Sequence, residues 1–402
     1  MSRILTASKS FFAIFVAQSE GFGMFKRLLF FYFICLTINV QPVQGQIIKN
    51  FSKYNYQFEV RGHYGIFLQH HFEMQRFNSH FPAAEVCLQR ATFGNKKWES
   101  LYNYPIVGVA AYFSPLGDFQ EVGKVFAVYP FIDFPLNHNL ENSLNFRLGL
   151  GLAWITNKFD PIENYKNFAI GSHLNAAASL YLEYRRRLSH RFTWITAFGL
   201  THFSNGSMKT PNYGLNLLTV STGFSWFLKS PNPYLNKKLL PELYKFEFDG
   251  KKWISTELAL SLGMKDMTQE VGQRFFVYNL ALNTMKQISM SGRIGLGFDL
   301  TFDGSDMAVL DKKQIPYDSK WQLLKPGANF AYEMLLDKTS FLFNLGFHLA
   351  GKELSEGQMY QKLSVKQHFT NNLYGMITLT VHYGKADYIG FGMGYRLNFK
   401  YY

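Results

Sequence analysis

Residues 201–216 contain the side-chain types that nucleophilic catalysis requires. His202 and Ser204 are two positions apart, so on a β-strand their side chains project from the same face. An imidazole beside a hydroxyl can act as its general base, and a third polar group can orient the imidazole. Asn216 lies where the next strand would begin, and it is the candidate third group. The spacing predicts an acyl-transfer site made of Ser204, His202 and Asn216.

The two segments that carry these residues alternate apolar and polar positions, as β-strands with one buried face do. The apolar positions that share the parity of His202 or Asn216 are Phe192, Trp194, Phe198, Leu200, Leu218, Val220, Phe224 and Trp226. If that face meets lipid, the three polar side chains face hydrocarbon near a membrane rim. Polar groups placed there are functional-site candidates, although serine and asparagine are also ordinary residues of strand ends and His202 could simply lie at headgroup level.

The same alternation runs through most of the 402 residues, of which 47% are hydrophobic and 18% aromatic. Beyond the N-terminal leader, no stretch approaches the roughly 20 unbroken apolar residues of a membrane helix. The pattern predicts an all-β, antiparallel transmembrane β-barrel of a bacterial outer membrane, with both chain ends periplasmic. About sixteen strands are expected, near 56–68, 83–92, 105–114, 122–133, 143–156, 173–188, 191–204, 214–228, 252–264, 274–286, 289–302, 328–337, 340–350, 359–368, 372–383 and 387–400.

The chain divides into four parts. Residues 1–45 have the basic start, apolar core and small-residue end of a leader and signal peptide. Residues 46–228 form a first barrel, 229–250 a proline-marked periplasmic linker or long turn, and 251–402 the remaining strands. We favour an eight-stranded barrel followed by a second barrel. The alternative is one large barrel of 14–16 strands, whereas an open sheet would leave unpaired backbone groups in lipid.

The formal net charge is +13, but the Lys and Arg residues are scattered and form no nucleic-acid module. The expected partners are the phosphates of lipopolysaccharide and of other outer-membrane lipids, and homodimer formation is left open. Cys35 lies in the signal peptide, so Cys87 is the one cysteine of the mature chain. No Cys/His pattern suggests a metal site, and no organic cofactor is implied.

Two further groups of polar residues fall on the opposite, lumen-facing parity. His173 and Asn175 share it with Ser179 and Glu183, which predicts polar packing inside the barrel. Glu183 is also expected to pair with Arg185 there, while the run 185–187 as a whole reads as a charge cluster beside a tight periplasmic turn.

The sequence resembles the PagL-like lipid A deacylases, or acyloxyacyl hydrolases, over about residues 83–228. The resemblance rests on the segments 149–154 (GLGLAW), 169–175 (AIGSHLN), 202–205 (HFSN) and 211–212 (PN). It implies an eight-stranded barrel whose site opens sideways to the outer leaflet, with Ser204 as nucleophile and His202 as base. Asn205 and Asn212 would stabilise the oxyanion or shape the loop. The implied function is a serine esterase that removes an ester-linked acyl chain from lipid A.

One position departs from this family, whose third catalytic residue is glutamate where this chain has Asn216. Asparagine can hold a histidine tautomer but adds no charge to stabilise an imidazolium. Outer-membrane phospholipase A has a similar His-x-Ser-Asn-Gly stretch with an asparagine partner, so a phospholipid substrate, and with it calcium, is the alternative. A non-enzymatic barrel, such as a channel or a structural protein, is the competing class.

Overall fold

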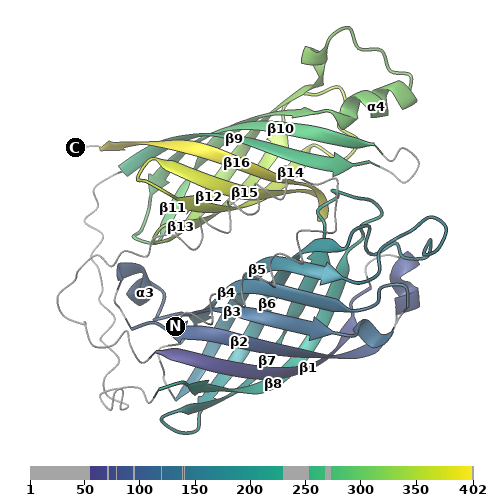
Figure 1. Cartoon of the computed structure of the whole chain (residues 1–402). Helices are drawn as coiled ribbons and strands as arrows, with labels where there is room; N and C mark the ends of the chain where they lie inside the picture. The colour runs from purple at the N-terminus through teal and green to yellow at the C-terminus, as the bar shows by residue number, and fades with distance from the viewer. Residues whose placement is uncertain are drawn as a thin grey trace, which may run out of the picture. The chain divides into compact units, whose positions relative to one another are not determined.

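The computed structural model describes residues 55–229 and 253–400, apart from the short stretches 70–71, 78, 94–95, 119, 138, 140 and 268–272. The predicted signal peptide, nearly all of the predicted linker 229–250, and Tyr401 and Tyr402 lie outside the described residues. Within the described ranges, sixteen strands form two closed antiparallel barrels of eight strands each (Figure 1).

The first barrel consists of consecutive neighbours along the chain, and it closes where β1 pairs with β8. Its strands are β1 (Tyr56–Phe67), β2 (His80–Ala91), β3 (Ile106–Ser114), β4 (Val125–Pro135), β5 (Asn142–Ile155), β6 (Leu174–Arg187), β7 (Phe192–Ser204) and β8 (Leu215–Phe227). The described parts of its connections include the short helices η1 (Phe72–Phe77), α3 (Lys97–Leu101) and η2 (Leu116–Asp118).

The second barrel repeats this order and closes where β16 pairs with β9. Its strands are β9 (Trp253–Asp266), β10 (Arg274–Gln287), β11 (Gly292–Asp303), β12 (Leu324–Leu336), β13 (Thr339–His348), β14 (Met359–His368), β15 (Leu373–His382) and β16 (Lys385–Lys400). The connection between β11 and β12 contains α4 (Ser305–Lys312) and η4 (Lys320–Leu323).

These closures confirm the two-barrel prediction and exclude the single large barrel. The predicted strand ends agree with the observed ones to within a few residues. The largest difference is at β12, which begins at Leu324 because Lys325, Pro326 and Gly327 pair with β11 although they do not alternate. The helix α4 lies in the connection between the strands that we predicted near 289–302 and 328–337.

The lumen of the first barrel is filled by charged side chains that neutralise one another. Arg61 Nη1 lies 2.5 Å from Glu183 Oε1, and Arg147 Nη1 lies 2.7 Å from Glu85 Oε1. Arg185 donates to Glu183 Oε2 at 3.0 Å, which confirms the predicted pair. Arg185 is therefore a buried lumen residue and not part of a solvated cluster. Eight-stranded barrels have interiors just wide enough for such packing.

The lumen of the second barrel has its own network. Lys366 Nζ lies 2.5 Å from Glu257 Oε2 and 3.0 Å from Glu333 Oε1. Arg396 bonds the same two carboxylates. Both barrel interiors are thus occupied by paired charges, which does not favour the water-filled channel of the competing class.

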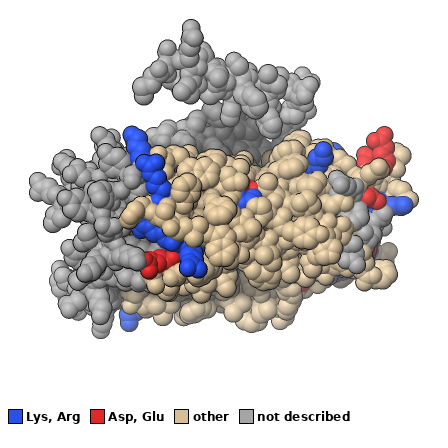
Figure 2. All heavy atoms as spheres, turned by 90° about the horizontal axis from the view of Figure 1, so that it is seen from below, with Lys and Arg blue, Asp and Glu red and all other residues tan. Residues whose placement is uncertain are grey.

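The outward positions of the strands are apolar in both barrels. Examples are Leu180, Phe198 and Val220 in the first barrel and Leu260, Phe298 and Phe343 in the second, all of them exposed. On the face drawn in Figure 2, most of the surface is uncharged and the charged side chains lie mainly toward its ends. An apolar exterior around a polar interior is the arrangement of an outer-membrane barrel.

Among the residues that the structure describes, no helix is long and apolar enough to cross a membrane.

Candidate active site

The hairpin of β7 and β8 positions the predicted catalytic side chains. Register pairs His202 directly with Asn216. Burial alternates along β7, with Thr201 and Phe203 fully buried toward the lumen and His202 and Ser204 half-buried on the other face. Asn216 is half-buried between the buried Leu215 and Leu217. The three side chains therefore share the outward face of the barrel wall.

His202 and Asn216 are joined by a short hydrogen bond, with 2.6 Å between His202 Nδ1 and Asn216 Oδ1. Because an amide oxygen can only accept, this contact requires the proton on Nδ1 and leaves the lone pair on Nε2. That is the tautomer a general base needs. The hydrogen bond does not include Ser204, whose side chain lies two positions further along the same face.

Gly214 makes room for the imidazole, a role that sequence reasoning missed. Its φ of +78° is in the left-handed region, and a Cβ there would lie 2.7 Å from His202 Cε1. Any other residue would press on the ring and also strain the backbone. The available signal was a glycine immediately before the strand that carries the histidine's partner.

Asn205 and Asn212 hold the connection between β7 and β8 in shape. The backbone N–H of Asn205 donates to Asn212 Oδ1 at 3.0 Å. The Asn205 side chain is 3% exposed, and its amide donates to Lys209 O at 2.8 Å and to Ser172 Oγ at 2.9 Å. These donors are satisfied by the loop itself and by Ser172 of the β5–β6 connection, so the contacts correspond to the loop-shaping alternative.

The segment around Ser172 fastens the β5–β6 connection to this loop. Tyr213 N donates to Phe168 O at 3.2 Å and Gly214 N to Ala169 O at 2.9 Å. Gly171 packs so closely that a Cβ would lie 2.6 Å from Lys209 O. The segment 169–175 (AIGSHLN) therefore supports the backbone beneath His202, which gives a physical reason for its presence beside the His-x-Ser motif.

Of the two polar residues predicted to face the lumen, one does so. Asn175 is 2% exposed and donates to Ser172 O at 2.8 Å. The expectation for His173 is wrong: β6 begins at Leu174, and the His173 ring stacks on the exposed, outward Trp154 with centroids 5.0 Å apart. A strand parity does not extend into the loop before the strand.

Two family models match the chain. The model described as lipid A 3-O-deacylase (PagL) matches residues 83–225, and the model described as the C-terminal domain of acyloxyacyl hydrolase matches residues 254–400. The chain belongs to the PagL-like family of acyloxyacyl hydrolases. The first model covers the first barrel from β2 to β8 and leaves out β1, and the second model covers all eight strands of the second barrel. Membership agrees with an outer-membrane hydrolase that acts on lipid A, at the level of the family.

Comparison with curated proteins gives no significant match. Solved structures that match this chain include OccAB4 from Acinetobacter baumannii, at 8% identity, with 88% of this chain and 100% of that chain covered and a TM-score of 0.24. The siderophore receptor PirA from Pseudomonas aeruginosa has 9% identity, coverages of 86% and 81%, and a TM-score of 0.18. Likenesses at these TM-scores carry no argument about function.

Proposed function

We propose that this protein is an outer-membrane serine esterase that removes an ester-linked acyl chain from lipid A. The observation that carries the proposal is the His202–Asn216 hydrogen bond on the outward face of the barrel wall. A base held in the required tautomer at this position can meet an acyl chain that never leaves the membrane. A buried or lumen-facing site would not be accessible to such a substrate.

In the proposed mechanism the Ser204 hydroxyl attacks the ester carbonyl while His202 Nε2 takes its proton. Asn216 Oδ1 keeps the proton on Nδ1 and stops the ring from turning. Collapse of the tetrahedral intermediate expels the sugar hydroxyl, which receives the proton from His202, and leaves an acyl-enzyme on Ser204. Water, deprotonated by His202, then attacks the acyl-enzyme, and the fatty acid leaves as His202 returns the proton to the Ser204 oxygen. Backbone amides of the loop that Asn205 and Asn212 shape would stabilise the oxyanion.

The loops beside this site carry positive charge that suits an anionic headgroup. Burial, together with the nearby ammonium of Lys158, lowers the pKa of Lys209 from its ordinary value. A phosphate bound between the two ammonium groups would reduce the repulsion between them. Lipid A carries such phosphates, and so do phospholipids, so this feature supports a membrane-lipid substrate without selecting one.

A phospholipase A-type reaction is the second candidate, and one observation favours it. The residue bonded to His202 is an asparagine, the partner found in that other family, and not the glutamate of the deacylases. The two reactions share the residues and the mechanism and differ in the lipid that occupies the outward face.

Mass spectrometry of total lipids from cells expressing the protein, beside a Ser204→Ala control, tests the proposal. The expected result is lipid A lacking one acyl chain with the native protein and unchanged lipid A with the variant. Lysophospholipid in its place would transfer the function to the phospholipase class. Unchanged lipids in both samples would support the non-enzymatic barrel.

A further inference from the structure

The second barrel holds a group of metal-ligating side chains at the end where β15 and β16 meet. Glu356 lies in the connection between β13 and β14, His382 ends β15, and Asp387 lies near the start of β16. Their nearest ligand atoms all lie within 4.8 Å of one another. This site is remote in sequence from residues 202–216 and belongs to the part of the chain that the proposed esterase reaction does not use.

A β-bulge turns Asp387 into the barrel. Thr380 pairs with Tyr388 and the next residue, Val381, pairs with Ala386, so Asp387 has no partner across the ladder. As a result Asp387 and Tyr388 are both buried, at 8% and 2% exposure, where strict alternation would turn one of them outward. Bulges often re-aim a side chain beside a functional site.

The two ring nitrogens of His382 face a backbone carbonyl on one side and Asp387 on the other. Its Nδ1 lies 3.1 Å from the backbone carbonyl of Met359, which can only accept, so the ring proton belongs on Nδ1. Its Nε2 then faces Asp387 Oδ2 at 3.5 Å. In the neutral ring with its proton on Nδ1, Nε2 carries the lone pair that a metal ion would use. Metal-binding histidines are commonly held by this kind of Nδ1–H contact to a carbonyl.

The charges around the cluster also leave a place for a cation. Lys265 Nζ lies 2.5 Å from Asp303, 2.7 Å from Asp387 Oδ1 and 3.4 Å from Glu356. Lys325 Nζ contacts Asp306 at 2.9 Å and Asp303 at 3.9 Å. Among these described ion pairs, two ammonium groups thus face four carboxylates.

We propose that His382 Nε2, Asp387 Oδ2 and the Glu356 carboxylate bind a divalent transition-metal ion of the Zn²⁺ type at the outer end of the second barrel. One imidazole and two carboxylates form a mixed nitrogen and oxygen set, which suits zinc better than the all-oxygen preference of Mg²⁺ or Ca²⁺. A divalent ion would add positive charge where carboxyl groups outnumber ammonium groups. The Glu356 side chain is 48% exposed, which gives the ion an entry path from solvent.

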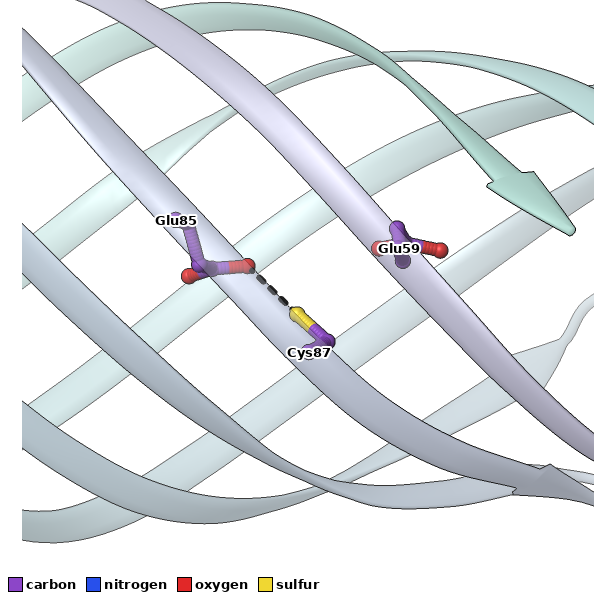
Figure 3. Close-up of side chains that lie close together, drawn as sticks. All are labelled: Glu59, Glu85 and Cys87. Carbon is purple, nitrogen blue, oxygen red and sulfur yellow. Dashed lines mark hydrogen bonds between the residues drawn. The ribbon is translucent and has the colours of Figure 1, made fainter.

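A second cluster in the first barrel shows what distinguishes the proposed site. Glu59, Glu85 and Cys87 also lie close together (Figure 3). However, Glu85 is bonded by Arg147 at 2.7 Å and by the Cys87 thiol at 3.2 Å, and all three residues are fully buried. The guanidinium groups already supply the positive charge, and the cluster has no exposed member. It therefore fits an internal ion-pair network and not a metal site.

The test is zinc binding to the purified, chelator-treated full chain in detergent micelles, followed by isothermal titration calorimetry. His382→Ala and Glu356→Gln remove one ligand each while keeping the Asp387–Lys265 pair, so both should fold, and circular dichroism checks this. His190→Ala is the matched control, because His190 is exposed in the turn between β6 and β7. We expect one zinc per chain in the native protein and the control, and binding at least about tenfold weaker in the two ligand variants.

Binding should also weaken on acidification, because protons compete for the ligands. Cobalt in place of zinc gives a second readout, since its visible spectrum reports the coordination of the ion and should change in His382→Ala. Equal zinc affinity of the native protein and His382→Ala, or no zinc binding at all, would overturn the proposal. Neither result bears on the esterase, whose residues are in the other barrel.

Discussion

The two barrels end differently at corresponding hairpins. In β7 and β8 the outward face carries His202, Ser204 and Asn216, while the lumen side carries buried Thr201 and Phe203. In β15 and β16 the outward face carries Leu379, Val381 and Ile389, while Thr380, His382 and Asp387 turn inward. The strand order and closure are the same, yet the polar groups point in opposite directions.

The two barrels differ in whether they place polar side chains on the lipid-facing surface, where such groups are energetically unfavourable. An outward polar group near the membrane rim is unfavourable unless it is paired or used, and the first barrel pairs His202 with Asn216 at 2.6 Å. The second barrel keeps its lipid-facing wall apolar at this hairpin and buries its polar groups inside. We therefore expect reaction with membrane lipid at the first barrel, whereas the proposed ion site lies in the second.

Removing the proposed base should have the largest effect on the rate of deacylation. We expect His202→Ala to lower the rate of lipid A deacylation by about 10³-fold or more, because it removes the group proposed to take the proton of Ser204. His190→Ala should leave the rate unchanged, since that side chain is exposed in a distant turn. A rate loss of less than tenfold in His202→Ala would contradict the assigned role.

Substitutions of Asn216 test how this chain differs from the relatives that have glutamate as the third residue. Asn216→Ala should lower kcat by about 10²-fold or more through loss of the tautomer-fixing contact, with little change in KM. Asn216→Asp should retain activity and move the acid limb of the pH–rate profile to higher pH, because a carboxylate stabilises the imidazolium. An unchanged pH profile in the Asp variant would argue against direct contact in the working enzyme.

The space beside the imidazole should matter somewhat less. Gly214→Ala is expected to lower kcat by about tenfold to a hundredfold, since its Cβ would lie 2.7 Å from His202 Cε1 and displace the ring. Gly62→Ala is the matched control, because a Cβ there meets nothing within 4 Å. Equal kinetics for the two variants would show that the position of His202 does not depend on Gly214.

The smallest effect is expected in the second barrel. Ser364 lies inside it, hydrogen-bonded to Thr378 at 2.7 Å. Ser364→Ala should change the rate of deacylation less than about twofold, as is usual for residues away from the reacting atoms. A loss of rate comparable to that of Ser204→Ala would contradict the assignment of the reaction to the first barrel.

Much of the fold and the main candidate residues could be predicted from local pattern. Period-2 alternation gave the strands to within a few residues, and parity put His202, Ser204 and Asn216 on the outward face. The sequence favoured two barrels but could not exclude one large barrel. The β1–β8 and β9–β16 closures are long-range pairings, which the alternation of apolar and polar residues does not encode.

The remaining features depend on departures from regular strands. Gly214 and Ser172 act through loop contacts. Asp387 points inward because of a bulge, and Glu356 joins it from a separate connection, so no sequence spacing indicated their proximity. The stacking of His173 on Trp154 likewise follows from where β6 begins.

The most direct test of the account is covalent labelling of the folded protein with an activated alkyl phosphonate, a mimic of the ester transition state, followed by peptide mass spectrometry. We predict one adduct, on Ser204, which is absent when His202 is replaced by Ala. An adduct on a different serine, or no adduct in a protein that nevertheless deacylates lipid A, would contradict the assignment of Ser204 and His202 as nucleophile and base.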